Sequence, residues 1–246
     1  MISHYWQSSR APRYSLLFAL PLLIIYQILA TLAPAGRGGI AVRNGADVIL
    51  QSVFVWLAGA WGPRLFMLCL IGVGAWLIAK DLRAHRGGGS FKPAVLGGML
   101  VESVALSLVF GVVVGILTAL LLGAPPPSMR LASGTADLGR STLLMLSLGA
   151  GIYEELLFRV VIVGLLAWGA KRLLGLRPLA GIVATVLGAL IFSAFHYIGP
   201  YGDHLEVYSF VFRTIAGLFF SGLYLARGFG ITAWTHALYD VFLLLR

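Results

Sequence analysis

The chain has 246 residues, of which 59% are hydrophobic and 11% are charged, and its formal net charge is +9. Soluble domains average about 25% charged residues, so this composition excludes an ordinary soluble domain and indicates a membrane protein. Because the basic residues lie between apolar runs, they are interpreted as anchors at anionic lipid headgroups, and no nucleic-acid partner is predicted.

Seven or eight apolar runs are candidates for transmembrane helices, which need roughly 17–25 residues each. Arg10 and Arg13 precede the first run, whose length favours an uncleaved helix over a signal peptide with an apolar region of about 7–15 residues. The second run is short and contains Asp47 and Gln51, so it can span, re-enter or lie at the interface. The runs are 14–33, 46–61, 64–79, 93–122, 141–168, 178–197, 205–225 and 230–245.

Breaks between the runs are marked by proline, glycine and charge. They include a basic loop at 80–92 with glycines at 87–89, and three prolines at 125–127. We find no internal repeat and no interdomain linker. The sequence therefore predicts one membrane domain over 1–246, an all-α polytopic bundle of about 7–8 helices around an intramembrane cavity. Cys69 stands alone, so neither a disulfide framework nor a cysteine-based metal site is predicted.

The distribution of Lys and Arg predicts the orientation in the membrane. Placing loops 80–92 and 171–177 in the cytoplasm puts most of the basic residues inside. This choice holds whether or not 46–61 crosses the membrane, so the side of the N-terminus stays open. The C-terminus is predicted on the outer face, and the predicted location is the bacterial inner (plasma) membrane.

Three ionisable residues lie inside the run 141–168, in the stretch Gly-Ile-Tyr-Glu-Glu-Leu-Leu-Phe-Arg. A charge at bilayer depth costs about 3 kcal/mol or more, so such residues are rare and mark functional sites. Glu155 and Arg159 are four residues apart and can form a structural ion pair on one helix face. Glu154 is rotated by about 100° from Glu155 and lacks a local partner, which makes it the candidate for chemistry.

Two later runs carry further polar residues. The run 178–197 contains His196, and the run 230–245 contains His236 and Asp240, which share a helix face at a spacing of four. Each histidine can also be a satisfied core residue, and Asp240 can serve only to orient His236. Glu102 is expected to hydrogen-bond to a neighbouring helix.

Arg213 also lies inside an apolar run and requires an acidic partner. Asp203 and Glu206 in the preceding turn are the candidates.

Two carboxylates and two histidines within a membrane domain suit the activation of water. A carboxylate can act as general base, a histidine can share the water, and a second polar pair can stabilise an oxyanion. The same residues, Glu154, His196, His236 and Asp240, could instead ligate zinc. The sequence contains no His-Glu-x-x-His pattern, so it gives no direct metal signal.

The three motifs, Glu154-Glu155-x-x-x-Arg159, Phe192-x-x-x-His196 and His236-x-x-x-Asp240, occur in this order in separate apolar runs. This pattern resembles the CPBP family of intramembrane proteases, which includes CAAX prenyl endopeptidases of the Rce1 type and bacterial Abi-type proteins. The resemblance covers about 140–246, the expected catalytic core, whereas 1–135 match only as apolar N-terminal helices.

The resemblance implies peptide-bond hydrolysis in a water-filled cavity within the membrane. It implies that Glu154 and His196 activate water, that Glu155 and Arg159 support them, and that His236 and residue 240 hold the oxyanion. Family members have been described both as metalloproteases and as glutamic-type proteases, and the metal-free form is favoured here. An ionised Asp240 has no hydrogen to donate, so orientation of His236, protonation or metal binding are its expected roles.

Straight helices would keep these residues apart, because His196 falls near the outer end of its run and His236 near the inner start of the last one. Bent or strongly tilted helices are therefore expected. The expected substrate is a membrane-embedded or membrane-proximal protein or peptide, as in maturation or removal of a C-terminal sorting tag. The alternatives are a transporter with an ion path, and a non-catalytic immunity or binding protein of the same fold.

Overall fold

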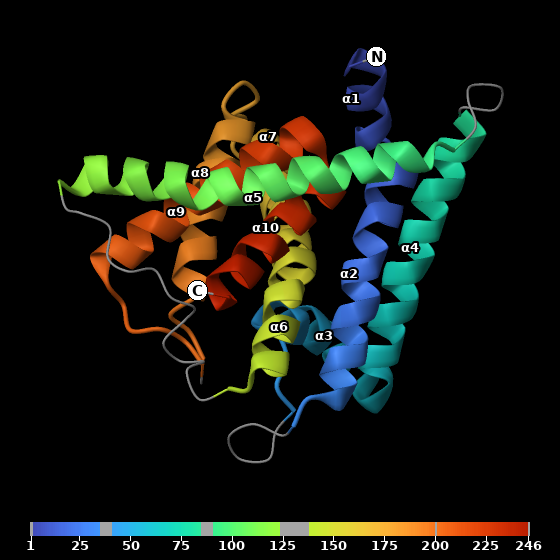
Figure 1. The fold of residues 1–246 in the computed structure, drawn as a ribbon, viewed down its shortest axis with the longest axis horizontal. Coiled ribbons are helices and arrows are strands. Elements are labelled where there is room, and N and C mark those ends of the chain that lie inside the picture. Colours follow the sequence, from blue (N-terminus) through green and yellow to red (C-terminus); the bar gives the residue numbers. More distant parts are fainter. Residues whose placement is uncertain (1, 35–40, 85–90, 124–137, 200, 246) are drawn as a thin grey trace.

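The computed structural model describes residues 2–34, 41–84, 91–123, 138–199 and 201–245, and within these ranges the chain forms helices and no β-strand (Figure 1). The prediction of an all-α bundle is confirmed. The glycines at 87–89 and the prolines at 125–127, which were predicted to break helices, lie outside the described residues.

The N-terminal part forms α1 (Ile2–Arg10), α2 (Pro12–Leu32), α3 (Gly45–Ala58) and α4 (Gly62–Ala84). The helix α1 was not predicted. Helices α2 and α4 lie side by side (Figure 1). A short 3-10 turn, η2 (Gly59–Trp61), folds α3 back on the start of α4, so closely that a Cβ at Gly62 would collide with the backbone of Phe54 and Val55.

The ends of these helices show whether the run 46–61 is a span of its own. Asp81, near the end of α4, meets Arg13 at the start of α2, with 3.6 Å between the Oδ2 and Nε atoms. Lys92 then donates its backbone N–H to the Tyr14 hydroxyl (2.8 Å). Helix α4 thus returns to the end from which α2 departs, and α3 does not cross as a separate span. Helix α4 also runs to Ala84, whereas the sequence predicted an end at 79.

Helix α5 (Pro93–Leu122) has the predicted bounds and crosses α2 at a large angle (Figure 1). The predicted run 141–168 becomes one continuous helical path with two π-helical stretches. Its parts are α6 (Arg140–Gly149), η4 (Ala150–Glu154), η5 (Leu156–Ile162) and α7 (Val163–Arg172). The C-terminal helices are α8 (Ala180–Phe195), α9 (Val207–Arg227) and α10 (Phe229–Leu244).

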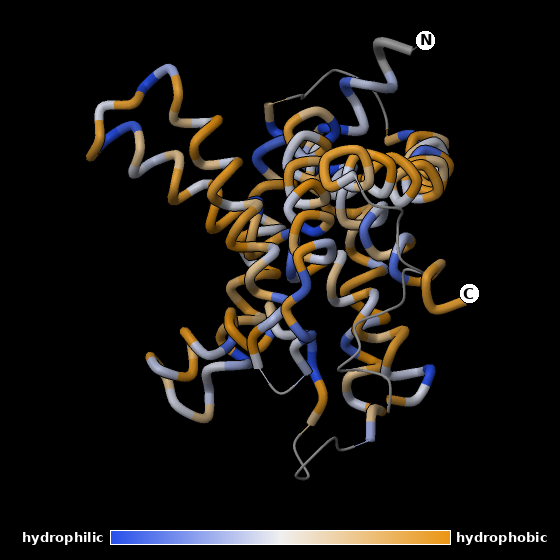
Figure 2. Tube along the Cα trace, turned by 90° about the vertical axis from the view of Figure 1, so that its left-hand side faces the viewer, coloured by the Kyte–Doolittle hydropathy of each residue, from blue (hydrophilic) through white to orange (hydrophobic). Residues whose placement is uncertain are grey.

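The outer surface suits lipid. Hydrophobic residues extend along the helices, with many large apolar side chains exposed (Figure 2). Four described stretches are long and apolar enough to cross a membrane: Pro12–Leu32, Gly45–Ala84, Pro93–Leu122 and Val207–Arg227. The other expected spans are shorter or interrupted, because α8 and α10 have 16 residues each and π-helical turns divide the path 140–172.

Helix α10 lies at the centre of the bundle. It contacts α2, α5, α6, η4 and α9, and its residues Ile231, Ala233 and Ala237 are fully buried. Small residues on this helix allow close approach of neighbouring backbones, as is usual where helices meet in membranes. Every helix that carries a predicted site residue therefore reaches α10 directly or through one neighbour.

Candidate active site

Two glycines bring the motif helix against its neighbours. A Cβ at Gly151 would lie 2.7 Å from the Ala237 Cβ and would collide with the Ala233 carbonyl oxygen, both on α10. A Cβ at Gly149 would lie 2.6 Å from the ring of Tyr26 on α2. The wide π-helical turn that follows carries Glu154 into the interior, which agrees with the frequent occurrence of π-bulges at functional sites.

Asn44 holds one oxygen of Glu154. The Asn44 Nδ2 donates to Glu154 Oε1 (3.0 Å), while its Oδ1 accepts from the Ala46 N–H (2.9 Å) and caps α3. The Asn44 backbone N–H donates to the Tyr26 hydroxyl (3.1 Å), which donates to Asp47 (2.8 Å). The amide orientation is therefore fixed from both ends, because the helix cap can use only the oxygen.

The other oxygen of Glu154 faces His196. The Glu154 Oε2 accepts no hydrogen bond from the described protein groups, and it lies 3.8 Å from His196 Nε2. The His196 Nδ1 lies 2.8 Å from the Phe192 carbonyl oxygen, which can only accept, so Nδ1 carries the proton. In a neutral ring, Nε2 then presents a lone pair. Two acceptors at this separation can both receive hydrogen bonds from one water molecule.

Glu155 links the first motif to the third. Its Oε1 lies 2.7 Å from His236 Nδ1, and its Oε2 lies 3.1 Å from Arg159 Nε, so the predicted ion pair with Arg159 is present. The Arg159 guanidinium also lies over the ring of Phe192, 4.4 Å from its centroid. The ring of Phe220 stacks on His236 at 4.5 Å. Glu155 therefore orients His236 from within a closed aromatic environment.

Asp240 is further from His236 than Glu155 is. Its Oδ2 lies 3.8 Å from His236 Nε2. Glu155 forms the shorter contact, on the opposite ring nitrogen of His236. The sequence did not predict this contact, because residues 155 and 236 are 81 positions apart.

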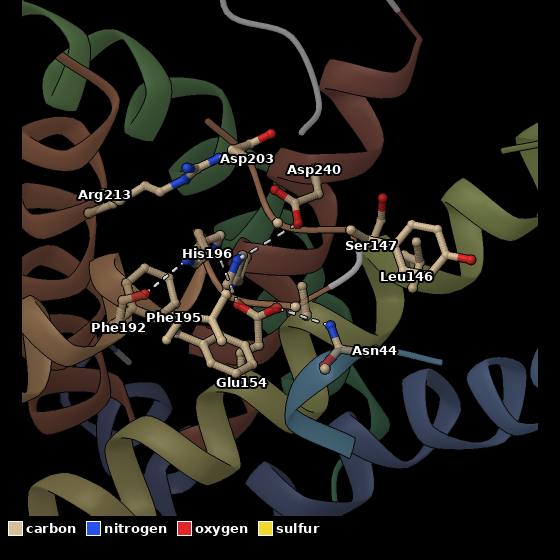
Figure 3. A pocket seen from close by; sticks show the side chains of 18 of the residues that line it. Asn44, Leu146, Ser147, Glu154, Phe192, Phe195, His196, Asp203, Arg213 and Asp240 are labelled. Carbon is tan, nitrogen blue, oxygen red and sulfur yellow. Dashed lines mark hydrogen bonds and ion pairs between the residues drawn. The ribbon is translucent and has the colours of Figure 1, made fainter. Parts of the chain in front are cut away.

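The four predicted residues, Glu154, His196, His236 and Asp240, line a single cavity of about 850 Å³. Figure 3 shows Glu154 between Asn44 and His196, with Asp240 across the cavity. The convergence that straight helices would prevent is achieved by the π-helical turns, the short α8 and the oblique course of α10 (Figure 1).

Arg213 has the predicted partner. It forms an ion pair and a hydrogen bond with Asp203, beside the cavity (Figure 3). The Asp203 backbone N–H donates to the His196 carbonyl oxygen (2.9 Å), so the turn after α8 closes on itself and fixes the end of that helix.

Glu102 is also paired as expected. It binds Arg227 through two contacts of 2.6 and 2.7 Å and accepts from the Tyr5 hydroxyl (2.6 Å). Ser9 and the ring of Trp6 complete this anchor cluster, which consists of Tyr5, Trp6, Ser9, Glu102 and Arg227.

The four residues of the zinc alternative are not gathered around one point in the described part of the chain. In the described part of the chain, no group of three or more His, Cys, Asp or Glu residues is arranged to hold a metal ion. The donor atoms instead face one another in pairs: Glu154 with His196, and Glu155 with His236. We therefore derive no step through a metal.

Asn44 is the contributor that the sequence reasoning missed. It lies 110 positions before Glu154, in the part of the chain that matches only as apolar helices. The sequence around Asn44 contains only a local signal. An asparagine followed by Gly45-Ala46-Asp47 is typical of an N-cap and the first turn of a helix. Such a signal predicts a helix start, but not the second use of the amide.

Residues 138–242 match the model of the family described as type II CAAX prenyl endopeptidase Rce1-like. A search of curated proteins and a search of solved structures gave no match. The matched segment contains all three motifs and every predicted site residue. The match indicates a protease, and it supports the assignment of this segment to the CPBP family of CAAX-type intramembrane endopeptidases.

Proposed function

We propose that the protein hydrolyses a peptide bond of a membrane-embedded or membrane-proximal substrate, with Glu154 as general base. The observation that carries this proposal is the unpaired Glu154 Oε2 facing His196 Nε2 across 3.8 Å inside a cavity. One water molecule bridging these two acceptors is held with its oxygen free to attack a carbonyl carbon.

In the proposed reaction, Glu154 takes one proton from the water while the oxygen bonds to the peptide carbon. The second hydrogen of the water stays directed at His196 Nε2. Glu154 then delivers its proton to the leaving nitrogen as the C–N bond breaks, so the carboxylate is regenerated. General acid–base catalysis of this kind contributes roughly 10²–10⁴-fold in rate.

His236 is the proposed donor to the oxyanion. Its Nδ1 contacts Glu155, and a carboxylate favours the cationic ring, in which Nε2 also carries a hydrogen. That hydrogen can serve the negative charge that forms on the carbonyl oxygen. Glu155 and Arg159 are then positioning residues, which act through His236 and through the packing of the aromatic rings.

We favour a glutamic protease without a cofactor, because the donor atoms are arranged in pairs and not as a metal site. Metal analysis of active protein tests this proposal. Full activity without bound metal is expected, whereas activity lost on chelation and restored by zinc would overturn it.

The substrate proposed is a membrane-anchored protein or peptide, processed in maturation or in removal of a C-terminal sorting tag. Loops 80–92 and 171–177 are proposed to lie in the cytoplasm of a bacterium. The decisive experiment compares cleavage of a candidate membrane substrate by wild type and by Glu154→Ala, both purified. Product from the wild type alone is expected, and equal product from the two would refute the role of Glu154.

A further inference from the structure

One end of the molecule carries most of the basic residues that the structure describes. The start of α1 and α2 and the ends of α4 and α9 meet there: Arg10 Nη2 donates to the Leu225 carbonyl oxygen (3.2 Å), and Arg13 pairs with Asp81. The turn between α7 and α8 lies at the same end (Figure 1). The cations of this basic end are Arg10, Arg13, Lys80, Arg83, Lys92, Lys171, Arg172, Arg177 and Arg227.

The opposite end has few described cations. Arg43, Arg64 and Arg140 lie there, at the starts of α3, α4 and α6, and Arg213 lies beside the cavity, paired with Asp203. Arg43 is paired with Asp47 (2.6 Å). Since cytoplasmic segments of membrane proteins carry an excess of Lys and Arg, this asymmetry assigns the basic end to the cytoplasm. In the tertiary structure α1 lies at the basic end, whereas the sequence alone left the side of the N-terminus open.

The side chains along α4 indicate that the bilayer lies between the two ends. Near its start, the Arg64 guanidinium lies 4.8 Å from the ring centroid of Trp61, and near its end, the Lys80 ammonium lies 5.3 Å from that of Trp76. The two rings are 67% and 57% exposed. Residues 61 to 80 cover about 28 Å at 1.5 Å per residue, close to the roughly 30 Å of a hydrocarbon core. Aromatic and basic side chains are typical anchors at both interfaces.

The cavity lies at the end opposite to the basic end. Several lining residues stand at helix termini at this end of the molecule. Asn44 precedes α3, Leu143 is in the first turn of α6, and His196 follows α8. The start of α9 and the last turns of α10 complete the wall, with Tyr208 and Leu243 among the lining residues. Residues 198–199 and 201–204 and Glu206 border the cavity, and His204 and Glu206 are exposed there.

We propose that the cavity opens on the membrane face opposite to the basic end, so that the protein cleaves the outward-facing part of membrane-anchored polypeptides. The substrate class in this inference rests on the proposed hydrolysis. The face on which the cavity opens does not depend on catalysis. The substrates it selects are exported chains still held by a membrane segment. A peptide bond on the cytoplasmic side does not reach Glu154 without crossing the bilayer.

Cysteine labelling tests the proposal. Cys69 is the single cysteine of the chain and is exposed on α4, so Cys69→Ala provides the background. Single cysteines are then placed by Leu205→Cys beside the cavity, Leu146→Cys in its wall and Leu174→Cys in the turn after α7. A membrane-impermeant maleimide is applied to bacterial spheroplasts before and after permeabilisation. We expect the first two to react before permeabilisation and Leu174→Cys only afterwards.

The opposite labelling pattern would overturn the orientation. Reaction at Leu205→Cys with protection at Leu146→Cys would overturn the opening of the cavity on that face. Because labelling needs no cleavage, the two proposals fail separately. The expected labelling together with equal cleavage by wild type and Glu154→Ala would reject the proposed catalytic role alone.

Discussion

Two groups of buried and half-buried side chains in this molecule each combine a glutamate with a basic residue, and they differ in how completely they are paired. In the anchor cluster, Glu102 and Arg227 form two short contacts, and Tyr5 and Ser9 use further polar atoms. In the cavity, Glu154 and His196 stand 3.8 Å apart, and one oxygen of Glu154 has no protein partner.

The difference separates structural from chemical use of charge. A buried charge costs free energy unless it is paired and hydrogen-bonded, so a completed cluster such as that of Glu102 needs no ligand. An unpaired carboxylate oxygen that borders a cavity is completed by water or substrate instead. The geometry of pairing thus decides whether a glutamate in this molecule is expected to have a structural or a chemical role.

The largest effect on activity among these tests is expected for His196→Gln. The variant keeps a polar side chain but removes the Nε2 lone pair that faces Glu154, so kcat should fall by about 10²–10⁴-fold. His204→Gln is the matched control, because His204 borders the cavity and is exposed. Comparable losses in both variants would contradict the special position of His196.

A large effect on stability is expected for Arg227→Met. This change leaves Glu102 without its cation, and the free energy of unfolding should fall by about 2–3 kcal/mol, with Glu102 in part solvated. Activity per folded molecule should stay at the wild-type level. Unfolding in detergent measures the first quantity and cleavage the second. In the double variant Glu102→Gln with Arg227→Met, part of the stability should return, and an additive loss would argue against the pairing.

A moderate effect is expected for Asn44→Ser. Serine can cap α3, but it lacks the amide N–H that holds Glu154 Oε1, so kcat should fall about tenfold, as for loss of one hydrogen bond to a charged group. Circular dichroism checks that the helices remain. Wild-type activity of Asn44→Ser would show that the amide does not position the base.

The smallest effect is expected for Asp240→Asn. Glu155 already orients His236, and an asparagine at 240 can donate an N–H to an oxyanion, so kcat should change by no more than about threefold. Cleavage assays on the folded variant measure this. Near-complete loss would instead assign the Asp240 charge an essential role.

The sequence by itself determined the class of fold, the family motifs and several pairings. Long apolar runs specify membrane helices because hydrocarbon cannot satisfy backbone polar groups, and the spacing of four specifies the ion pair of Glu155 with Arg159. It also predicted partners for Arg213 and Glu102, since charges within apolar runs require them.

The tertiary structure decided which distant groups meet. Asn44 reaches Glu154, and Glu155 reaches His236, through contacts of 3.0 and 2.7 Å between residues more than 80 positions apart. Such contacts depend on the crossing of helices, on the π-helical turn and on the missing side chain of Gly151, which no local pattern encodes. The end of the bundle at which α1 lies was decided in the same way, because the contact between Arg13 and Asp81 brings the start of α2 and the end of α4 together.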